Sequence, residues 1–133
     1  MTVAAGEIID RMYGALASRD LDSAMACLAP DARVWHCFDG IAQDRAGILA
    51  GWRDLLAAFS KFAFVDVRRQ KTTEGFIQQQ MMTALTASGE MIAWPICLVV
   101  RLENGLIARI DEYIDRAGRF SVGDMHSAIT PGL

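Results

Sequence analysis

Three carboxylates fall within five positions of the segment IARIDEYID, residues 107–115, near the end of the chain. The segment is typical of a β-strand, in which successive side chains point to opposite faces of the sheet. This alternation puts Asp111 and Asp115 on a polar face and leaves Glu112 on a face that is otherwise apolar. A carboxylate there is unfavourable unless it is hydrogen-bonded, paired or protonated. Glu112 is therefore the first candidate for a general acid or base; the alternative is a strand-end glutamate that bends out to solvent.

The segment VWHCF, residues 34–38, holds two further side chains that could take part in catalysis. With Trp35 and Cys37 facing inward, alternation predicts that His36 lies on the outer face, as a surface or interface residue. The functional interpretation of His36 is a general base. Cys37 would act as a nucleophile only with a lowered pKa. Since no charged partner for it is evident in the sequence, a small buried side chain is the favoured interpretation.

Several common site motifs are absent from the sequence. It contains no GxGxxG, P-loop, GxSxG or HExxH pattern, so no nucleotide, serine-hydrolase or zinc-protease site is predicted. His36 and His126 have no cysteine or histidine nearby at the spacing of zinc ligands. We therefore expect no metal and no cofactor.

The composition limits the classes of partner. At 133 residues the chain has the size of one domain, and we expect a single domain over residues 1–133. The hydrophobic content of 53% and mean hydropathy of +0.23 predict an apolar cavity, a buried interface between subunits, or both. The longest apolar run, residues 91–100, is far shorter than the roughly 20 residues of a membrane-spanning helix. The net charge of −3 gives no basic surface for nucleic acid. We expect neither a membrane nor a nucleic acid as partner.

The start of the sequence shows no signal peptide. The three cysteines are odd in number and widely spaced, which does not fit a disulfide framework. Both features predict a cytoplasmic protein.

Helical periodicity dominates the first half of the chain. Apolar residues at helical spacing predict helices over residues 4–18 and 21–28, with Asp20 capping the second and Pro30 ending it. Asp44 can cap a third helix, and its predicted buried face carries an apolar stripe of Ile48, Trp52, Leu55, Leu56 and Phe59.

Strand patterns follow the helices. They predict strands at residues 32–38, 62–72, 75–87, 91–102 and 106–115. The short breaks between the last four, including the Asn104-Gly105 turn signal, indicate antiparallel neighbours. The predicted fold is α+β: a curved antiparallel sheet with about three helices packed over its concave face around an apolar pocket.

The candidate pocket residues come from the expected inward faces of these elements. Aromatic and methionine side chains suit a flat apolar ligand, although core packing alone would also recruit them. In the strand at 75–87 the candidates share the face of Gln79. The predicted ligand-binding residues are Met12, Tyr13, Trp35, Cys37, Trp52, Gln79, Met81, Thr83, Trp94, Ile96, Leu98 and Ile110.

Two long segments resemble the nuclear transport factor 2-like superfamily, in its SnoaL-like branch. They are IIDRMYGALASRDLDSAMACLAPDARVWHCF, residues 8–38, and ENGLIARIDEYID, residues 103–115. The resemblance implies a cone-shaped α+β fold with a deep, mostly apolar pocket for a small molecule, and a homodimer formed through the outer face of the sheet. Families of this kind include ketosteroid isomerases, limonene-epoxide hydrolases, scytalone dehydratases, polyketide cyclases and non-catalytic binding modules.

The functional residues of these families are mostly replaced in this chain. The tyrosine, the base and the buried acid of the isomerases correspond to Met12, Cys37 and Leu98, with Tyr13 one position from the tyrosine. The epoxide-hydrolase residues of the first and third strands are replaced as well. Their last-strand carboxylate is retained as Glu112, so the resemblance also implies that Glu112 faces the pocket.

Two functions are compatible with the sequence. The first is a cofactor-free isomerase, cyclase, dehydratase or hydrolase that acts on a small apolar or aromatic molecule. In it Glu112 would be the acid or base, and Tyr13, Gln79 and Thr83 would orient the substrate. The second is a non-catalytic ligand-binding or protein-interaction module, whose pocket binds without chemistry or is filled by its own side chains.

Overall fold

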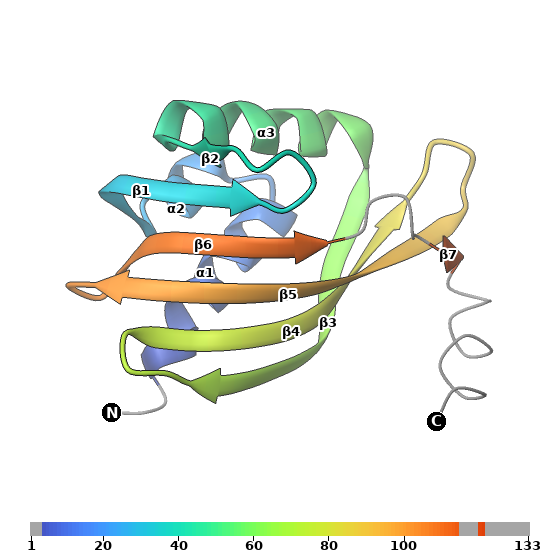
Figure 1. The fold of residues 1–133 in the computed structure, drawn as a ribbon. Coiled ribbons are helices and arrows are strands. Elements are labelled where there is room, and N and C mark those ends of the chain that lie inside the picture. Colours follow the sequence, from blue (N-terminus) through green and yellow to red (C-terminus); the bar gives the residue numbers. More distant parts are fainter. Residues whose placement is uncertain (1–3, 115–119, 122–133) are drawn as a thin grey trace, which may run out of the picture.

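The computed structural model of the protein describes residues 4–114 and 120–121. In this part of the chain helices and strands pack as an α+β arrangement (Figure 1), and the fold class predicted from the sequence is confirmed. The helices are α1 (Ala4–Ala17), α2 (Leu21–Met25) and α3 (Arg45–Ala58). The strands are β1 (Leu28–His36), β2 (Ala42–Gln43), β3 (Lys61–Lys71), β4 (Gly75–Leu85), β5 (Met91–Glu103), β6 (Leu106–Ile114) and β7 (Phe120–Ser121).

The strands form one curved, open sheet in the order β2-β1-β6-β5-β4-β3, with β7 paired to β5. The long strands β3 to β6 are antiparallel neighbours, as the short connections predicted. The Asn104-Gly105 turn between β5 and β6 has φ angles of 53° and 78°, the positive values that this turn signal requires. β1 differs, because it pairs with β6 in parallel. The helices cover one face of the sheet (Figure 1).

Side-chain caps define the starts of α2 and α3. The Asp20 carboxylate accepts a hydrogen bond from the backbone N–H of Ser23, and the Asp44 carboxylate accepts one from Gly47. Both caps were predicted from the sequence, and each satisfies a backbone donor that the helix leaves free. The prediction that Pro30 ends α2 is wrong, because α2 stops earlier and Pro30 lies within β1.

A β-bulge in β3 controls which side chains of this strand face inward. The register with β4 shifts between Val65 and Arg68, and Asp66 has a φ of 54°. A β-bulge places an extra residue in one strand, which bends the strand and changes the face to which the following side chains point. As a result Phe64, before the bulge, and Arg69, after it, both reach residues on the inner face of the sheet.

The hydrophobic core lies between this inner face and the helices. In α1 the predicted stripe is buried at Ile8, Met12 and Leu16. In α3 only part of the predicted stripe enters the core, because Ile48 is buried whereas Trp52 remains half-buried beside a cavity. Within the described residues no helix combines the length and the apolar character needed to cross a membrane.

Candidate functional site

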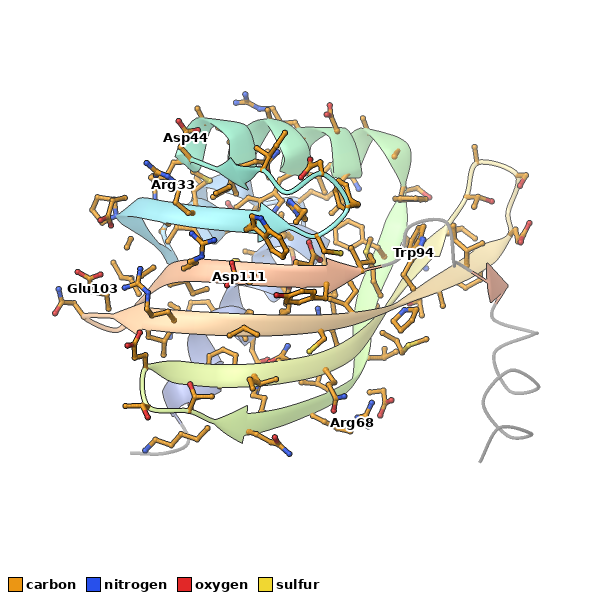
Figure 2. The ribbon with its side chains drawn as sticks, viewed as in Figure 1. Arg33, Asp44, Arg68, Trp94, Glu103 and Asp111 are labelled. Carbon is orange, nitrogen blue, oxygen red and sulfur yellow. The ribbon has the colours of Figure 1, made fainter. Side chains whose placement is uncertain are left out.

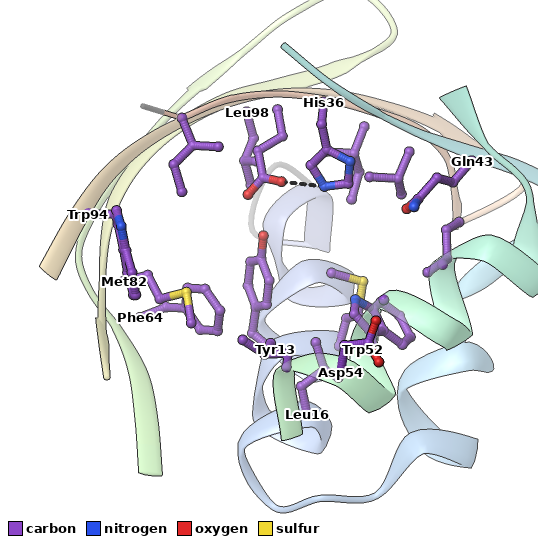
Figure 3. Close-up of a pocket in the computed structure, with 18 of the residues that line it drawn as sticks. Tyr13, Leu16, His36, Gln43, Trp52, Asp54, Phe64, Met82, Trp94 and Leu98 are labelled. Atoms are coloured by element: carbon purple, nitrogen blue, oxygen red, sulfur yellow. Dashed lines mark ion pairs between the residues drawn. The ribbon is translucent and has the colours of Figure 1, made fainter. Parts of the chain in front are cut away.

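A cavity of about 660 Å³ lies between the inner face of the sheet and helices α1 and α3 (Figure 3). This volume is typical of pockets that hold a small organic molecule. Most of its walls are apolar, and a few polar side chains converge on it. The lining residues are Met12, Tyr13, Leu16, Val34, His36, Phe38, Asp39, Gln43, Ile48, Gly51, Trp52, Asp54, Leu55, Ala58, Phe59, Phe64, Met82, Trp94, Leu98, Ile110, Glu112 and Ile114.

A close polar contact in the cavity joins two neighbouring strands. His36 at the end of β1 is the registered partner of Glu112 in β6, so both side chains leave the sheet on the same face. Nε2 of His36 lies 2.7 Å from Oε2 of Glu112 (Figure 3). The two side chains are 19% and 18% exposed. A carboxylate on an apolar face needs such a partner, and the parallel pairing of β1 with β6 supplies it.

Tyr13 rises from α1 toward this pair (Figure 3). Its ring stacks on Phe64, with ring centres 3.9 Å apart and an angle of 24° between the planes. Burial raises the pKa of Tyr13 well above its ordinary value of 10.0, and the negative charge of Glu112 raises it further. A hydrogen bond from the side chain of Gln80 opposes these two effects and lowers the pKa. Tyr13 is therefore a neutral phenol that can donate its O–H proton into the cavity.

The raised pKa of Tyr13 predicts a loss of stability at alkaline pH. The folded protein holds this proton more tightly than the unfolded chain, so the contribution is intact below pH 10 and declines as the pH rises further. Relative to a Tyr13→Phe variant, wild-type protein is expected to lose up to about 1.4 kcal/mol per pH unit above pH 10. Urea unfolding at pH 9, 10 and 11 measures the difference.

A Tyr113→Phe variant is the control for this titration, because Tyr113 lies on the protein surface and is 48% exposed. It should keep the alkaline loss of wild type. Equal pH dependence of wild type and Tyr13→Phe would contradict the assignment of a buried phenol at position 13.

Eight of the fourteen predicted site residues lie in the cavity wall. Glu112 lies there beside Ile110, on the face where alternation placed it. Trp94 and Leu98 of β5 line the cavity as well, and α3 contributes Trp52. From α1, both Met12 and Tyr13 reach it. Ile96 is buried on the same face of β5, but it packs in the core outside the cavity wall.

The prediction of which β1 side chains face the cavity is wrong, because the inward and outward positions are exchanged. His36, expected on the outer face, points into the cavity, whereas Trp35 and Cys37 point away from it. Trp35 instead packs edge-on against Tyr113 on the outer face, with ring centres 5.3 Å apart. Cys37 is exposed, and its Sγ atom contacts the backbone of Ile114. The error arose because apolar side chains occupy both faces of this strand end.

The predicted face of β4 is wrong for the same reason. Met82 lines the cavity, so alternation turns Gln79, Met81 and Thr83 to the outer face. Their inner-face neighbours Gln78 and Gln80 are buried, at 1% and 2% exposed. The segment GFIQQQMMTA, residues 75–84, carries glutamine and methionine at both odd and even positions. Its local pattern therefore does not indicate which face of the strand points inward.

Three polar cavity residues were missed from the sequence. Asp39 follows β1, Gln43 lies in β2, and Asp54 lies on α3 beside the predicted apolar stripe. None belongs to a motif, although Asp54 follows the predicted pocket residue Trp52 closely. In the described residues no three His, Cys, Asp or Glu side chains gather closely enough to hold a metal ion.

Residues 9–110 match the family model of the SnoaL-like domain. The match covers most of the chain. The chain belongs to the SnoaL-like domain family. This result confirms the resemblance seen in the sequence and places the protein in the nuclear transport factor 2-like superfamily. None of the curated proteins matches the sequence.

Solved structures share this fold at low sequence identity. An NTF2-like protein of unknown function from Burkholderia pseudomallei is 20% identical, with a TM-score of 0.72 over 96% of this chain and 98% of its own. A protein provisionally assigned as a polyketide cyclase from Xanthomonas campestris is 18% identical, with a TM-score of 0.72 over 84% and 90%. An LEH-like epoxide hydrolase from M. tuberculosis is 16% identical, with a TM-score of 0.70 over 96% and 90%. At these identities the similarity establishes the fold.

Proposed function

We propose that this SnoaL-like protein is a cofactor-independent acid–base enzyme that moves a proton on a small, flat, mostly apolar molecule carrying an oxygen. The observation behind the proposal is the contact of 2.7 Å between His36 and Glu112 on the wall of an apolar cavity. A carboxylate and an imidazole are the two groups that proteins use most for proton transfer. The cyclase and epoxide-hydrolase assignments of proteins with the same fold agree with this chemistry.

Three polar residues of the cavity have distinct roles in this proposal. Glu112 takes a proton from a carbon next to a carbonyl group, and the carbonyl oxygen gains negative charge. The O–H group of Tyr13 donates a hydrogen bond to this oxygen. His36 donates through Nε2 to the carboxylate and holds it in place. Return of the proton to another atom completes an isomerisation. Alternatively, attack of the carbanion on a second carbonyl carbon closes a ring, and the alkoxide that forms takes back the proton held by Glu112.

The cavity walls suggest how a substrate would lie. Phe64, Met82 and Trp94 form an apolar end, while Gln43 and Asp54 lie at the opposite end, with His36 between them (Figure 3). An aromatic ring fits the first end, because offset and edge-on ring contacts and methionine sulfur favour it. A polar substituent fits the second end. The substrate class is therefore an elongated aromatic or polyketide-like molecule with oxygen substituents.

The alternative function is a ligand-binding module of the same fold. The version in which the protein fills the pocket with its own side chains does not fit a cavity of about 660 Å³. The version with an open pocket is compatible with the contact between His36 and Glu112. An ion pair can be purely structural and need not take part in catalysis.

Ring opening of 5-nitrobenzisoxazole separates the two functions. A base removes the carbon-bound proton of this planar probe, the N–O bond breaks, and a coloured phenolate is released. We expect saturable acceleration of at least about a hundredfold over acetate at equal concentration, together with quenching of tryptophan fluorescence on binding. Binding without acceleration would overturn the enzyme proposal in favour of the binding module.

We also propose that the outer face of the sheet holds a second copy of the chain. Val65, Val99 and Tyr113 are 41%, 39% and 48% exposed there, and Trp35 extends the apolar surface. Exposed apolar groups that gather on one face commonly mark an interface between proteins. Sedimentation equilibrium should show a dimer at micromolar concentration, and a Val99→Arg/Tyr113→Arg variant should be monomeric. A monomeric wild type under these conditions would refute the dimer.

A further inference from the structure

Gln43 is a polar side chain of the cavity that the proposed proton transfer does not use. It lies in β2, where Val34 of β1 is its registered partner. Directly opposed residues of an antiparallel pair point to the same face of the sheet, and Val34 and Gln43 both line the cavity. His36 follows Val34 by two positions on the same face, so it is a diagonal neighbour of Gln43. The short strand β2 therefore places an amide near the proposed catalytic pair.

Two glycines of α3 leave room for the side chain of Gln43. A Cβ atom on Gly47 would lie 3.1 Å from Cβ and 3.4 Å from Cγ of Gln43. About one helical turn further along α3, a Cβ atom on Gly51 would lie 3.9 Å from Oε1 of Gln43. The Gln43 side chain therefore extends along the helix, with its aliphatic part against Gly47 and its amide near Gly51.

These two glycines are unfavourable for the helix itself. Glycine within a helix costs about 1 kcal/mol relative to alanine, and neither Gly47 nor Gly51 has a positive φ angle that would require it. The close approach of Gln43 gives Gly47 a packing role instead. A glutamine on an open surface can adopt many conformations, whereas this contact restricts where the Gln43 amide lies.

The amide of Gln43 is available to a ligand. Among the described residues its side-chain oxygen and nitrogen form no hydrogen bond, although Gln43 is half-buried. Together with Asp54 it lies at the end of the cavity opposite Phe64 (Figure 3). A molecule whose aromatic part contacts Phe64 would extend its other end toward Gln43.

The charges of the cavity decide which ligand group fits this amide. Asp39, Asp54 and Glu112 line the cavity, whereas no lysine or arginine of the described residues does. His36 can offset at most one of these three negative charges. A cleft lined by one sign of charge attracts the opposite sign and repels its own. Carboxylates only accept hydrogen bonds, and the amide of Gln43 can turn its oxygen to a donor as well. The cavity therefore favours a donor group and disfavours an anion.

We propose that Gln43 is a specificity-determining residue, which accepts a hydrogen bond from a hydroxyl or ammonium group at one end of an aromatic ligand. The inference rests on the proposed function for the position of the ligand, and it adds the chemical class of the ligand's polar end. In the proposed reaction the carbonyl group lies near Tyr13 and Glu112. The substrate class is then an aromatic ketone that also carries a hydroxyl or amino group.

A set of naphthalene compounds with one variable substituent tests this specificity. The compounds are 2-naphthalenemethanol, 2-(aminomethyl)naphthalene, 2-methylnaphthalene and 2-naphthoate, and isothermal titration calorimetry at neutral pH gives each Kd. We expect wild-type protein to bind the alcohol about tenfold more tightly than the methyl compound, as one hydrogen bond provides. The carboxylate should bind more weakly than the alcohol. Tighter binding of the amine than of the alcohol would identify an ammonium group as the preferred donor, and the reverse order a hydroxyl.

Substitutions at position 43 separate the hydrogen bond from the shape of the cavity. Gln43→Met keeps the size of the side chain but removes both polar atoms of the amide. It should reduce the preference for the alcohol to below about twofold, while the Kd of 2-methylnaphthalene stays the same. Gln43→Glu keeps an acceptor and should retain the preference. Gln79→Met is the matched control, because Gln79 is exposed on the outer face of β4, and it should bind all compounds like wild type.

Gly47→Ala tests the contact with α3 without changing the cavity wall, since Gly47 is not a lining residue. Its added methyl group presses on the aliphatic part of Gln43 and should lower the preference for the alcohol, although less than Gln43→Met does. Gly14→Ala in α1 is the control for the gain in helix propensity, because its Cβ meets nothing within 4 Å. It should leave the preference unchanged.

Equal affinities of wild-type protein for the alcohol and the methyl compound would overturn the proposal and make Gln43 an ordinary solvated amide. A preference that persists in Gln43→Met would overturn it as well. These measurements involve no turnover, so the inference and the proposed function can fail separately. A preference for the alcohol without ring opening of 5-nitrobenzisoxazole would retain the role of Gln43 and reject the enzyme. Ring opening without this preference would retain the enzyme and reject the role of Gln43.

Discussion

Replacing Glu112 by glutamine is expected to lower kcat/KM for proton abstraction about a thousandfold, while the affinity for the aromatic probe changes only a few fold. Glutamine has the shape of glutamate, and its amide oxygen can still accept the hydrogen bond from Nε2 of His36. The cavity wall is therefore preserved. What the amide lacks is a basic oxygen, so the loss falls on the chemical step. The rate of phenolate release at several probe concentrations separates kcat from KM.

Asp111→Asn is the matched control for this variant. Asp111 is the preceding residue of β6 (Figure 2), and its removal changes the net charge by the same amount. Its carboxylate points to the other face of the sheet, where it accepts a hydrogen bond of 2.8 Å from Nε of Arg109. The variant should turn over at the wild-type rate. Equal losses in Glu112→Gln and Asp111→Asn would show that the effect is a general one of charge, and Glu112 would not be the base.

Local signals in the sequence were sufficient for the elements of the fold. Asp20 and Asp44 precede apolar helical stripes, and a carboxylate at such a position caps whatever helix follows. The Asn104-Gly105 pair needs no tertiary information, since its preference for positive φ is its own. Glu112 could be placed for a related reason. The side chains of β6 are mostly apolar on one face and mostly polar or charged on the other, so the pattern indicates which face of the strand points inward.

The same logic failed where both faces of a strand look alike. Trp35 and Cys37 were assigned to the interior because they are apolar, yet the outer face of this sheet also carries apolar groups, and Trp35 packs there against Tyr113. The orientation of β1 is set by its pairing with β6, a strand from the other end of the sequence. No property of the segment VWHCF contains that information. The contact between His36 and Glu112 was therefore beyond prediction from local pattern.

The glutamines of β4 show a second limit of sequence reasoning. Buried amides are costly without partners, so the default expectation places glutamine outside. Here Arg69 of β3 donates to buried Gln78, and Gln78 donates in turn to buried Gln80. Arg69 faces inward only after the bulge at Asp66 has shifted the parity of its strand. One irregularity in a neighbouring strand thus decides which glutamines of the run belong to the interior.

A double-mutant cycle on His36 and Glu112 tests the pair without any substrate. We expect His36→Leu and Glu112→Leu each to lower the free energy of unfolding by about 2 to 3 kcal/mol, because each removes the contact between the two polar groups in a mostly apolar cavity. The double variant should cost about 2 kcal/mol less than the sum of the two. Both side chains keep some contact with water, which holds this coupling below that of a fully buried pair. Urea unfolding at neutral pH measures all four proteins.

The outer-face pair of Arg109 and Asp111 provides the reference cycle. Its atoms are also close, at 2.8 Å, but the side chains are 37% and 29% exposed. Water and salt screen such a pair, so its coupling should stay below about 1 kcal/mol and weaken with added salt. The coupling between His36 and Glu112 should be larger and less sensitive to salt. Equal couplings in the two cycles would mean that the cavity does not exclude water from the pair. Glu112 would then be an ordinary solvated carboxylate, without the environment that its proposed role as a base requires.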